Sequence, residues 1–160
     1  MSSLAKIKSF ILTHWEFREN PVHHPRSESL MLGFGLETLN NEMTLTKEEA
    51  SNLLDVQIDS FLYQELTEEL RVYAEQSSCL EVLFSIRLYL GRELFYKSNV
   101  FSYLNNCVRF QKAVEVFFAF LKTELTKVTY KLEKKIYSPA WASLREKEIL
   151  FLTNRGLQNG

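Results

Sequence analysis

Apolar residues recur along most of this chain at intervals of three and four, the spacing that places them on one face of an α-helix. Residues 4–19 show this pattern first, and Ser3 is placed to cap the helix. Pro21 should end it, because the residue before a proline is driven out of the helical region. Residues 22–27 are then expected to form a loop. The apolar positions of this first predicted helix are Leu4, Ile7, Phe10, Ile11 and Trp15.

Residues 30–39 are ambiguous. The run Leu-Met-Leu-Gly-Phe-Gly-Leu has the apolar density of a strand, but the rest of the sequence predicts no strand with which it can pair. We therefore expect a helix that is destabilised by its two glycines.

A clear helix begins after Thr46, because Thr46 and Glu49 have the spacing of a capping box. It should run to about residue 54, where Asp55 breaks it. A second helix is expected over residues 58–75.

The serines at 77 and 78 provide a cap for the next helix, which should reach Lys97. It carries apolar residues at helical spacing, which we expect to face a core. These are Leu80, Leu83, Phe84, Leu88 and Phe95.

The longest predicted helix covers residues 100–137, which contain neither proline nor glycine. At about 1.5 Å per residue it would extend more than about 50 Å, further than a domain of this size readily covers. Six of its residues follow one another at intervals of four and three, as in a coiled-coil seam. The seam predicts a homodimer, and its alternative is packing against the chain's own helix at 80–94. The candidate interface residues are Val114, Phe118, Leu121, Leu125, Val128 and Leu132.

The break at 137–139 is the best domain boundary in the chain. Pro139 is acceptable in the first turn of a helix. It begins either one helix that runs to residue 154 or a short turn before Ser143 caps another. The predicted fold is therefore all-α, a multi-helix bundle with one long helix at about 100–137 and a C-terminal helix.

Composition supports one compact domain, since 46% of the 160 residues are apolar and can form a core. The 19 basic and 20 acidic residues nearly balance, so no overall field favours nucleic acid or an anionic membrane. Locally the charge is uneven: residues 42–76 are acidic and residues 109–135 are basic. These segments either pair with each other, within the fold or between subunits, or are ordinary solvated helix faces.

Candidate chemistry is sparse. Cys79 and Cys107 lie in apolar surroundings without metal-like spacing, so we expect buried thiols. His14, His23 and His24 lack a third ligand at a recognised spacing, so no metal site is predicted. Catalytic signatures and phosphate-binding glycine loops are absent from the sequence, so we expect neither an enzyme nor a cofactor. The apolar segment at 4–12 is too short to span a membrane, which favours a cytoplasmic protein.

Aromatic residues are concentrated in the middle and late helices. Their number exceeds what one apolar stripe of a small bundle needs, so more than one side of the helix that carries residues 117–120 should be covered. A packed core, a subunit interface and a small-molecule pocket each explain this density. The residues are Phe84, Tyr89, Phe95, Tyr96, Phe101, Tyr103, Phe110, Phe117, Phe118, Phe120 and Tyr130.

Residues 45–62 have some features of a helix-turn-helix. Ser51 is small enough for two helices to touch, and Asp55 occupies the tight-turn position. The presumed recognition helix, however, carries Asp59, Glu65 and Glu68, which phosphates would repel. Two successive core helices explain the pattern without DNA.

The last eighteen residues have the pattern of a capped amphipathic helix. Ser143 is a candidate N-cap, Glu146 stands at the third position of a capping box, and Gly156 suits a left-handed turn that ends the helix. The sequence of this segment resembles that of the first helix of the LuxR-type helix-turn-helix family. The matching residues are Arg145, Glu146, Glu148, Ile149, Leu150, Leu152, Gly156, Leu157 and Asn159.

The resemblance implies a transcription regulator with a helical regulatory or dimerisation domain at 1–137. Residues 138–160 would then be a joint and the remnant of a DNA-binding domain that lacks its recognition helix here. DNA would be bound only through that missing part, and the resemblance implies no particular ligand. The alternative is a small helical adaptor or anti-activator that binds protein and not DNA.

Overall fold

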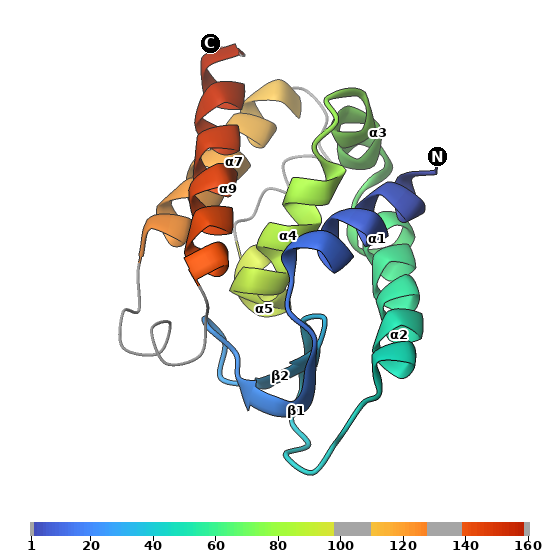
Figure 1. The fold of residues 1–160 in the computed structure, drawn as a ribbon. Coiled ribbons are helices and arrows are strands. Elements are labelled where there is room, and N and C mark those ends of the chain that lie inside the picture. The colour runs from blue at the N-terminus through green and yellow to red at the C-terminus, as the bar shows by residue number, and fades with distance from the viewer. Residues whose placement is uncertain (1, 98–109, 128–138, 159–160) are drawn as a thin grey trace.

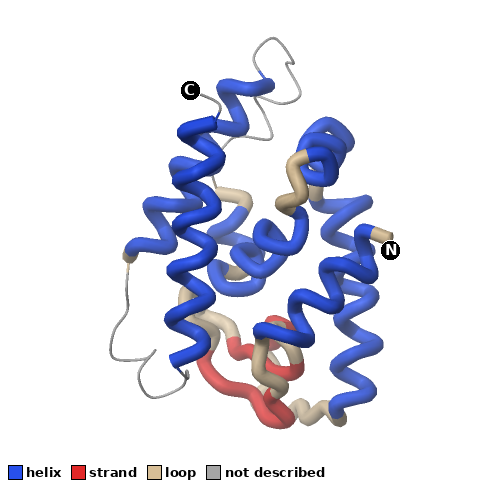
Figure 2. Tube along the Cα trace, turned by 45° about the horizontal axis from the view of Figure 1, so that its top comes forward, coloured by secondary structure: helices blue, strands red, loops and turns tan. Residues whose placement is uncertain are grey.

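The computed structural model describes residues 2–97, 110–127 and 139–158. Helices form a bundle, and a small antiparallel sheet closes one of its ends (Figures 1 and 2). In chain order the elements are α1 (Ser3–His14), β1 (Arg18–His23), β2 (Leu30–Gly33), β3 (Leu36–Thr38), α2 (Lys47–Ser60), the π-helical turn η1 (Phe61–Glu65), α3 (Glu68–Gln76), α4 (Leu80–Leu90), α5 (Arg92–Phe95), α7 (Phe110–Thr126) and α9 (Pro139–Gln158).

The predicted multi-helix bundle is present, but the sheet shows that the fold is not purely all-α. Its strands pair antiparallel in the order β1-β2-β3, so the ambiguous segment 30–39 supplies two strands and the residues before it supply the third. Gly33 and Gly35 have φ values of 63° and 92°, which allow the tight turn between β2 and β3. Pro21 is tolerated because β1 is an edge strand, interrupted by an irregularity between Arg18 and Val22.

The early helices differ from the prediction at their ends. α1 stops at His14, well before Pro21, and its cap is Ser2 rather than Ser3. The capping box of α2 is confirmed: the Thr46 hydroxyl accepts from the Glu49 N–H at 3.1 Å, and Glu49 Oε1 accepts from the Thr46 N–H at 3.0 Å. Asp55 does not end this helix. The break falls at Leu66, after η1.

The predicted helix up to Lys97 is divided at Gly91. This residue has φ 86° and ψ 154°, outside the helical region, and it separates α4 from α5. Cys79, rather than Ser77 or Ser78, precedes the first turn of α4, and it is a buried free thiol as expected.

The core is built around α4, which is buried along nearly its whole length. Aromatic rings meet edge to face there, with centroids 5.1 Å apart for Phe61 and Phe84 and 5.2 Å apart for Phe95 and Phe117. At least these aromatic residues therefore pack in the core of the single chain.

The last two helices lie side by side (Figure 1). α7 ends at Thr126, so one unbroken helix to residue 137 is wrong. Pro139 begins a single helix, α9, in which Ser143 is internal and Gly156 does not end the helix. Residues 98–109 and 128–138, with Cys107, Val128 and Leu132, lie outside the described residues.

Candidate functional site

A pocket of about 340 Å³ opens between the sheet and the helices, and we call it the Arg87 pocket. Five elements supply its walls, so its shape depends on the whole N-terminal half of the fold. The lining residues are Leu36, Glu37, Val56, Gln57, Ser60, Glu65, Arg87 and Arg92.

An ion pair forms the inner wall of this pocket. Arg87 Nε lies 2.8 Å from Glu65 Oε1 and Arg87 Nη2 lies 3.0 Å from Glu65 Oε2, a bidentate arrangement. Both side chains are less than a tenth exposed. Burial alone would raise the pKa of Glu65, but the hydrogen bonds and charge of Arg87 hold it below the ordinary value. Both groups are therefore charged at neutral pH.

Tyr96 completes the pair from α5's C-terminal side. Its hydroxyl donates to Glu65 Oε1 over 2.5 Å. Burial and this bond raise the pKa of Tyr96, so the hydroxyl stays a hydrogen-bond donor. The carboxylate of Glu65 is thus engaged on both oxygens.

The π-helical turn η1 places Glu65 at the pocket. The N–H of Leu66 bonds to the carbonyl of Phe61, five residues earlier, at 3.0 Å. Such turns widen a helix and occur frequently at functional sites. Sequence reasoning missed this pair because its members are far apart in the chain. The available signal was Arg87 itself, a single charge inside the apolar run of α4.

A second polar cluster supports the pocket from the hairpin side. Glu37 Oε1 accepts from the backbone N–H of Arg92 at 2.8 Å, and Glu37 Oε2 accepts from the Ser29 hydroxyl at 2.8 Å. Burial would raise the pKa of Glu37, yet these hydrogen bonds lower it. Glu37 is therefore a carboxylate that fixes the start of α5.

His24 is a structural residue rather than a metal ligand. Its Nε2 lies 2.7 Å from the carbonyl of Leu88, and its Nδ1 accepts from the N–H groups of Arg26 and Ser27. Burial lowers the pKa of His24, so the ring is neutral with its proton on Nε2. His23 is exposed, and the described residues contain no group of three side chains that could hold a metal ion.

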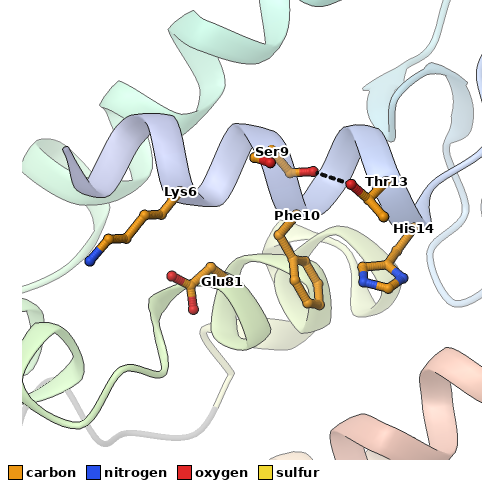
Figure 3. Close-up of a pocket in the computed structure, with 6 residues that line it drawn as sticks. All are labelled: Lys6, Ser9, Phe10, Thr13, His14 and Glu81. Carbon is orange, nitrogen blue, oxygen red and sulfur yellow. Dashed lines mark hydrogen bonds between the residues drawn. The ribbon is translucent and has the colours of Figure 1, made fainter. Parts of the chain in front are cut away.

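A groove of about 360 Å³ lies between α1 and Glu81 at the start of α4. Figure 3 shows its side chains. The ring centroids of Phe10 and His14 lie 4.5 Å apart, and the ring planes are tilted by 52°. The Thr13 hydroxyl donates to the Ser9 carbonyl, as in an ordinary helix, and no described hydrogen bond joins His14 to a hydroxyl. The groove therefore presents no nucleophile and base in contact among the described residues. The lining residues are Lys6, Ser9, Phe10, Thr13, His14 and Glu81.

The segment with the LuxR-like residues is attached to the core by buried polar groups, which we call the Glu148 cluster. Glu148 Oε1 lies 2.5 Å from Arg145 Nη2 and accepts from the Ser85 hydroxyl at 3.0 Å. Trp15 Nε1 donates to the same hydroxyl at 3.0 Å. The Arg145 guanidinium lies 4.1 Å from the ring centroid of Tyr89, a cation–π contact. α9 is thereby tied to α1 and α4.

Along α9, Leu144, Arg145, Glu148 and Leu152 are buried, while Leu150 is 59% exposed. Of the candidate dimer residues, the four that the structure describes are buried in the chain's own core. They are Val114, Phe118, Leu121 and Leu125. The homodimer itself stays a prediction.

Comparison with known proteins returned no family model, no curated protein and no solved structure that matches this chain. Within the described ranges, no helix combines the length and the apolar character needed to cross a bilayer. Function must therefore be inferred from the sites themselves.

Proposed function

We propose that this chain is a helical regulatory domain that acts by binding another protein. The observation that carries the proposal is a stripe of exposed residues along α2 and η1. Its residues are spaced four, three and four apart, which places them on one helical face. They are Asn52, Val56, Asp59 and Tyr63.

The two apolar residues of this stripe are largely exposed to solvent: Val56 is 64% exposed and Tyr63 is 62% exposed. Acidic residues on and beside the stripe predict that the partner is basic there. They are Glu48, Asp59 and Glu68, which are exposed and form no ion pair with any described residue. A partner with basic residues around an apolar contact would complement this surface, which we call the acidic face.

Affinity capture with crosslinking tests the proposal. The wild-type chain should retain a basic partner whose binding weakens as salt rises, because exposed charges are screened. The double variant Asp59→Lys/Tyr63→Ala should lose that partner. Leu39→Ala is the matched control, since Leu39 is 88% exposed and lies in the segment between β3 and α2. Identical partners for all three chains would contradict the proposal.

A second candidate is the regulatory domain of a LuxR-type regulator. The register of the α9 residues supports it, and so does the exposure of Leu150, which later helices of such a domain could cover. A gel-shift series at physiological salt separates the candidates. This chain should bind duplex DNA only weakly and without sequence preference, because no basic recognition helix is present among the described helices. Tight binding to one sequence, resistant to random competitor DNA, would favour the LuxR-type regulator instead.

A further inference from the structure

The Arg87 pocket has more hydrogen-bond donors than its own acceptors use. The carboxylate of Glu65 is occupied by Arg87 and Tyr96. The carboxylate of Glu37 is occupied by the Arg92 N–H and by serine hydroxyls of the β1–β2 loop. Both acidic groups facing the pocket are therefore already bonded.

The donors that remain belong to Arg92 and Gln57. The guanidinium of Arg92 is exposed at the rim and forms no hydrogen bond or ion pair with a described residue, although its charge acts on Glu65 at longer range. The side-chain amide of Gln57 likewise bonds to no described residue. A guanidinium offers two parallel N–H groups, which match the two oxygens of a carboxylate.

The charge of the ligand is limited by the fixed acids. Arg87 and Arg92 are balanced by Glu37 and Glu65, so the lining has no net positive charge to hold a dianion. Glu37 and Glu65 repel any anion, but this repulsion is about twice as large for a phosphate dianion as for a singly charged ligand, so a single negative charge beside the exposed Arg92 is favoured.

The remaining wall is apolar. Leu36 from β3 and Val56 from α2 both line the pocket, and Val56 is largely exposed. A volume of about 340 Å³ lies at the small end of ligand sites, which run from about 300 to 1,000 Å³. The space therefore suits a short hydrocarbon chain.

We infer that the Arg87 pocket binds a small monocarboxylic acid, with its carboxylate on Arg92 and Gln57 and its hydrocarbon chain against Leu36 and Val56. This goes beyond the proposed protein binding. Val56 belongs to both surfaces, but Asp59 and Tyr63, the residues changed in the test of protein binding, do not line the pocket, so the two proposals can fail separately. Occupancy of the pocket would make the domain a sensor of such acids.

An NMR titration of the full chain with pentanoate tests the inference. Saturable shifts are expected for the amide signals of Leu36, Gln57 and Arg92. Pentanamide, which has the same length but no charge, and inorganic phosphate should each cause no saturable shift at these signals. Arg92→Gln should weaken pentanoate binding at least about ten-fold, as expected for a lost charged hydrogen bond.

Arg71→Gln is the matched control, since it removes a surface arginine outside the pocket and should leave the pentanoate affinity unchanged. Thermal unfolding should show that both variants are folded, because Arg92 is exposed and Arg71 is partly exposed. Absence of saturable shifts in the wild-type chain would overturn the inference. Equal pentanoate affinity in Arg92→Gln, or equal binding of pentanamide, would overturn it as well.

Discussion

At the scale of single residues, the fold depends on a few charges that are buried and paired. Arg87 and Glu65 are both less than a tenth exposed, and each satisfies the other with two contacts. A buried ion pair contributes little net stability compared with apolar residues, but removal of one partner leaves an uncompensated charge. The two members of such a pair should therefore be far more sensitive to substitution than the many acids on the surface.

Glu65→Gln should lower the free energy of unfolding by about 3–5 kcal/mol, because the charge of Arg87 stays buried without its counter-ion. Urea denaturation at neutral pH measures this. The control Glu68→Gln changes an exposed acid in the neighbouring helix and should alter the unfolding free energy by no more than about 0.5 kcal/mol. A loss of similar size in both variants would show that the pair is not the cause.

At the scale of elements, local signals were reliable where one residue determined the local structure. The capping box at Thr46 predicted the start of α2, and Pro139 began a helix. The sheet was missed because pairing is not local: residues 30–39 give the strand pattern, but their partner β1 lies in a segment expected to be helix and loop. The break assigned to Asp55 failed because one aspartate is compatible with a helix, and here it pairs with Lys8 at 2.9 Å.

The candidate sites could be predicted even less well than the elements. The Arg87 pocket combines residues from β3, α2, η1, α4 and α5, and no short motif links them. Arg145 and Glu148 belong to the LuxR-like pattern, but their spacing does not indicate that Glu148 contacts Ser85 or that Arg145 contacts Tyr89. Such contacts depend on how helices pack, which the periodicity of each helix alone does not specify.

Gly91 makes the division between α4 and α5 testable. Its φ of 86° with ψ of 154° is reached almost only by glycine, and a Cβ atom would stand 3.2 Å from the His24 ring and from Ser27 Cβ. Gly91→Ala should therefore lower the free energy of unfolding by about 1–3 kcal/mol. Asn52→Ala, at an exposed position of α2, is the control and should be nearly neutral. A wild-type melting temperature in Gly91→Ala would contradict the strained geometry.

At the scale of the whole molecule, α9 belongs to the same packed body as the helices before it. It contacts α7, α4 and α1, and the Glu148 cluster lies where α9 meets α4 and the end of α1. Burial raises the pKa of Glu148 to about 7, against the opposing effects of Arg145 and Ser85. The attachment of α9 should therefore respond to pH near neutrality.

The direction of this response follows from proton binding. The folded chain keeps a proton on Glu148 up to about pH 7, whereas the unfolded chain releases it near the ordinary value of 4.5. Between these values the folded state binds more protons, so the contribution of Glu148 to the unfolding free energy falls as pH rises and is lost above pH 7. The whole change should not exceed about 4 kcal/mol, at about 1.4 kcal/mol for each pH unit between 4.5 and 7.

Chemical denaturation of the wild-type chain and of Glu148→Gln across pH 4.5–8 isolates this effect. Acids with lowered pKa, such as Glu37 and Glu65, contribute the opposite slope to both proteins. The unfolding free energy of the wild type minus that of Glu148→Gln should therefore fall as pH rises. Parallel curves would show that Glu148 has an ordinary pKa, and amide hydrogen exchange at Ile149 and Leu152 would show whether α9 opens alone.

The small sheet also affects how these molecules behave at high concentration. An open sheet edge can recruit a strand from another chain and begin aggregation. Here β3 is only three residues long, and β1 has Pro21, which lacks an N–H, within a charged segment. The N–H of Leu45 already bonds to the carbonyl of Glu19 at 3.1 Å on β1. Both edges are thus poor templates for a strand from a neighbouring molecule, so exposed side chains such as Val56 and Tyr63 do not bring strand pairing with them.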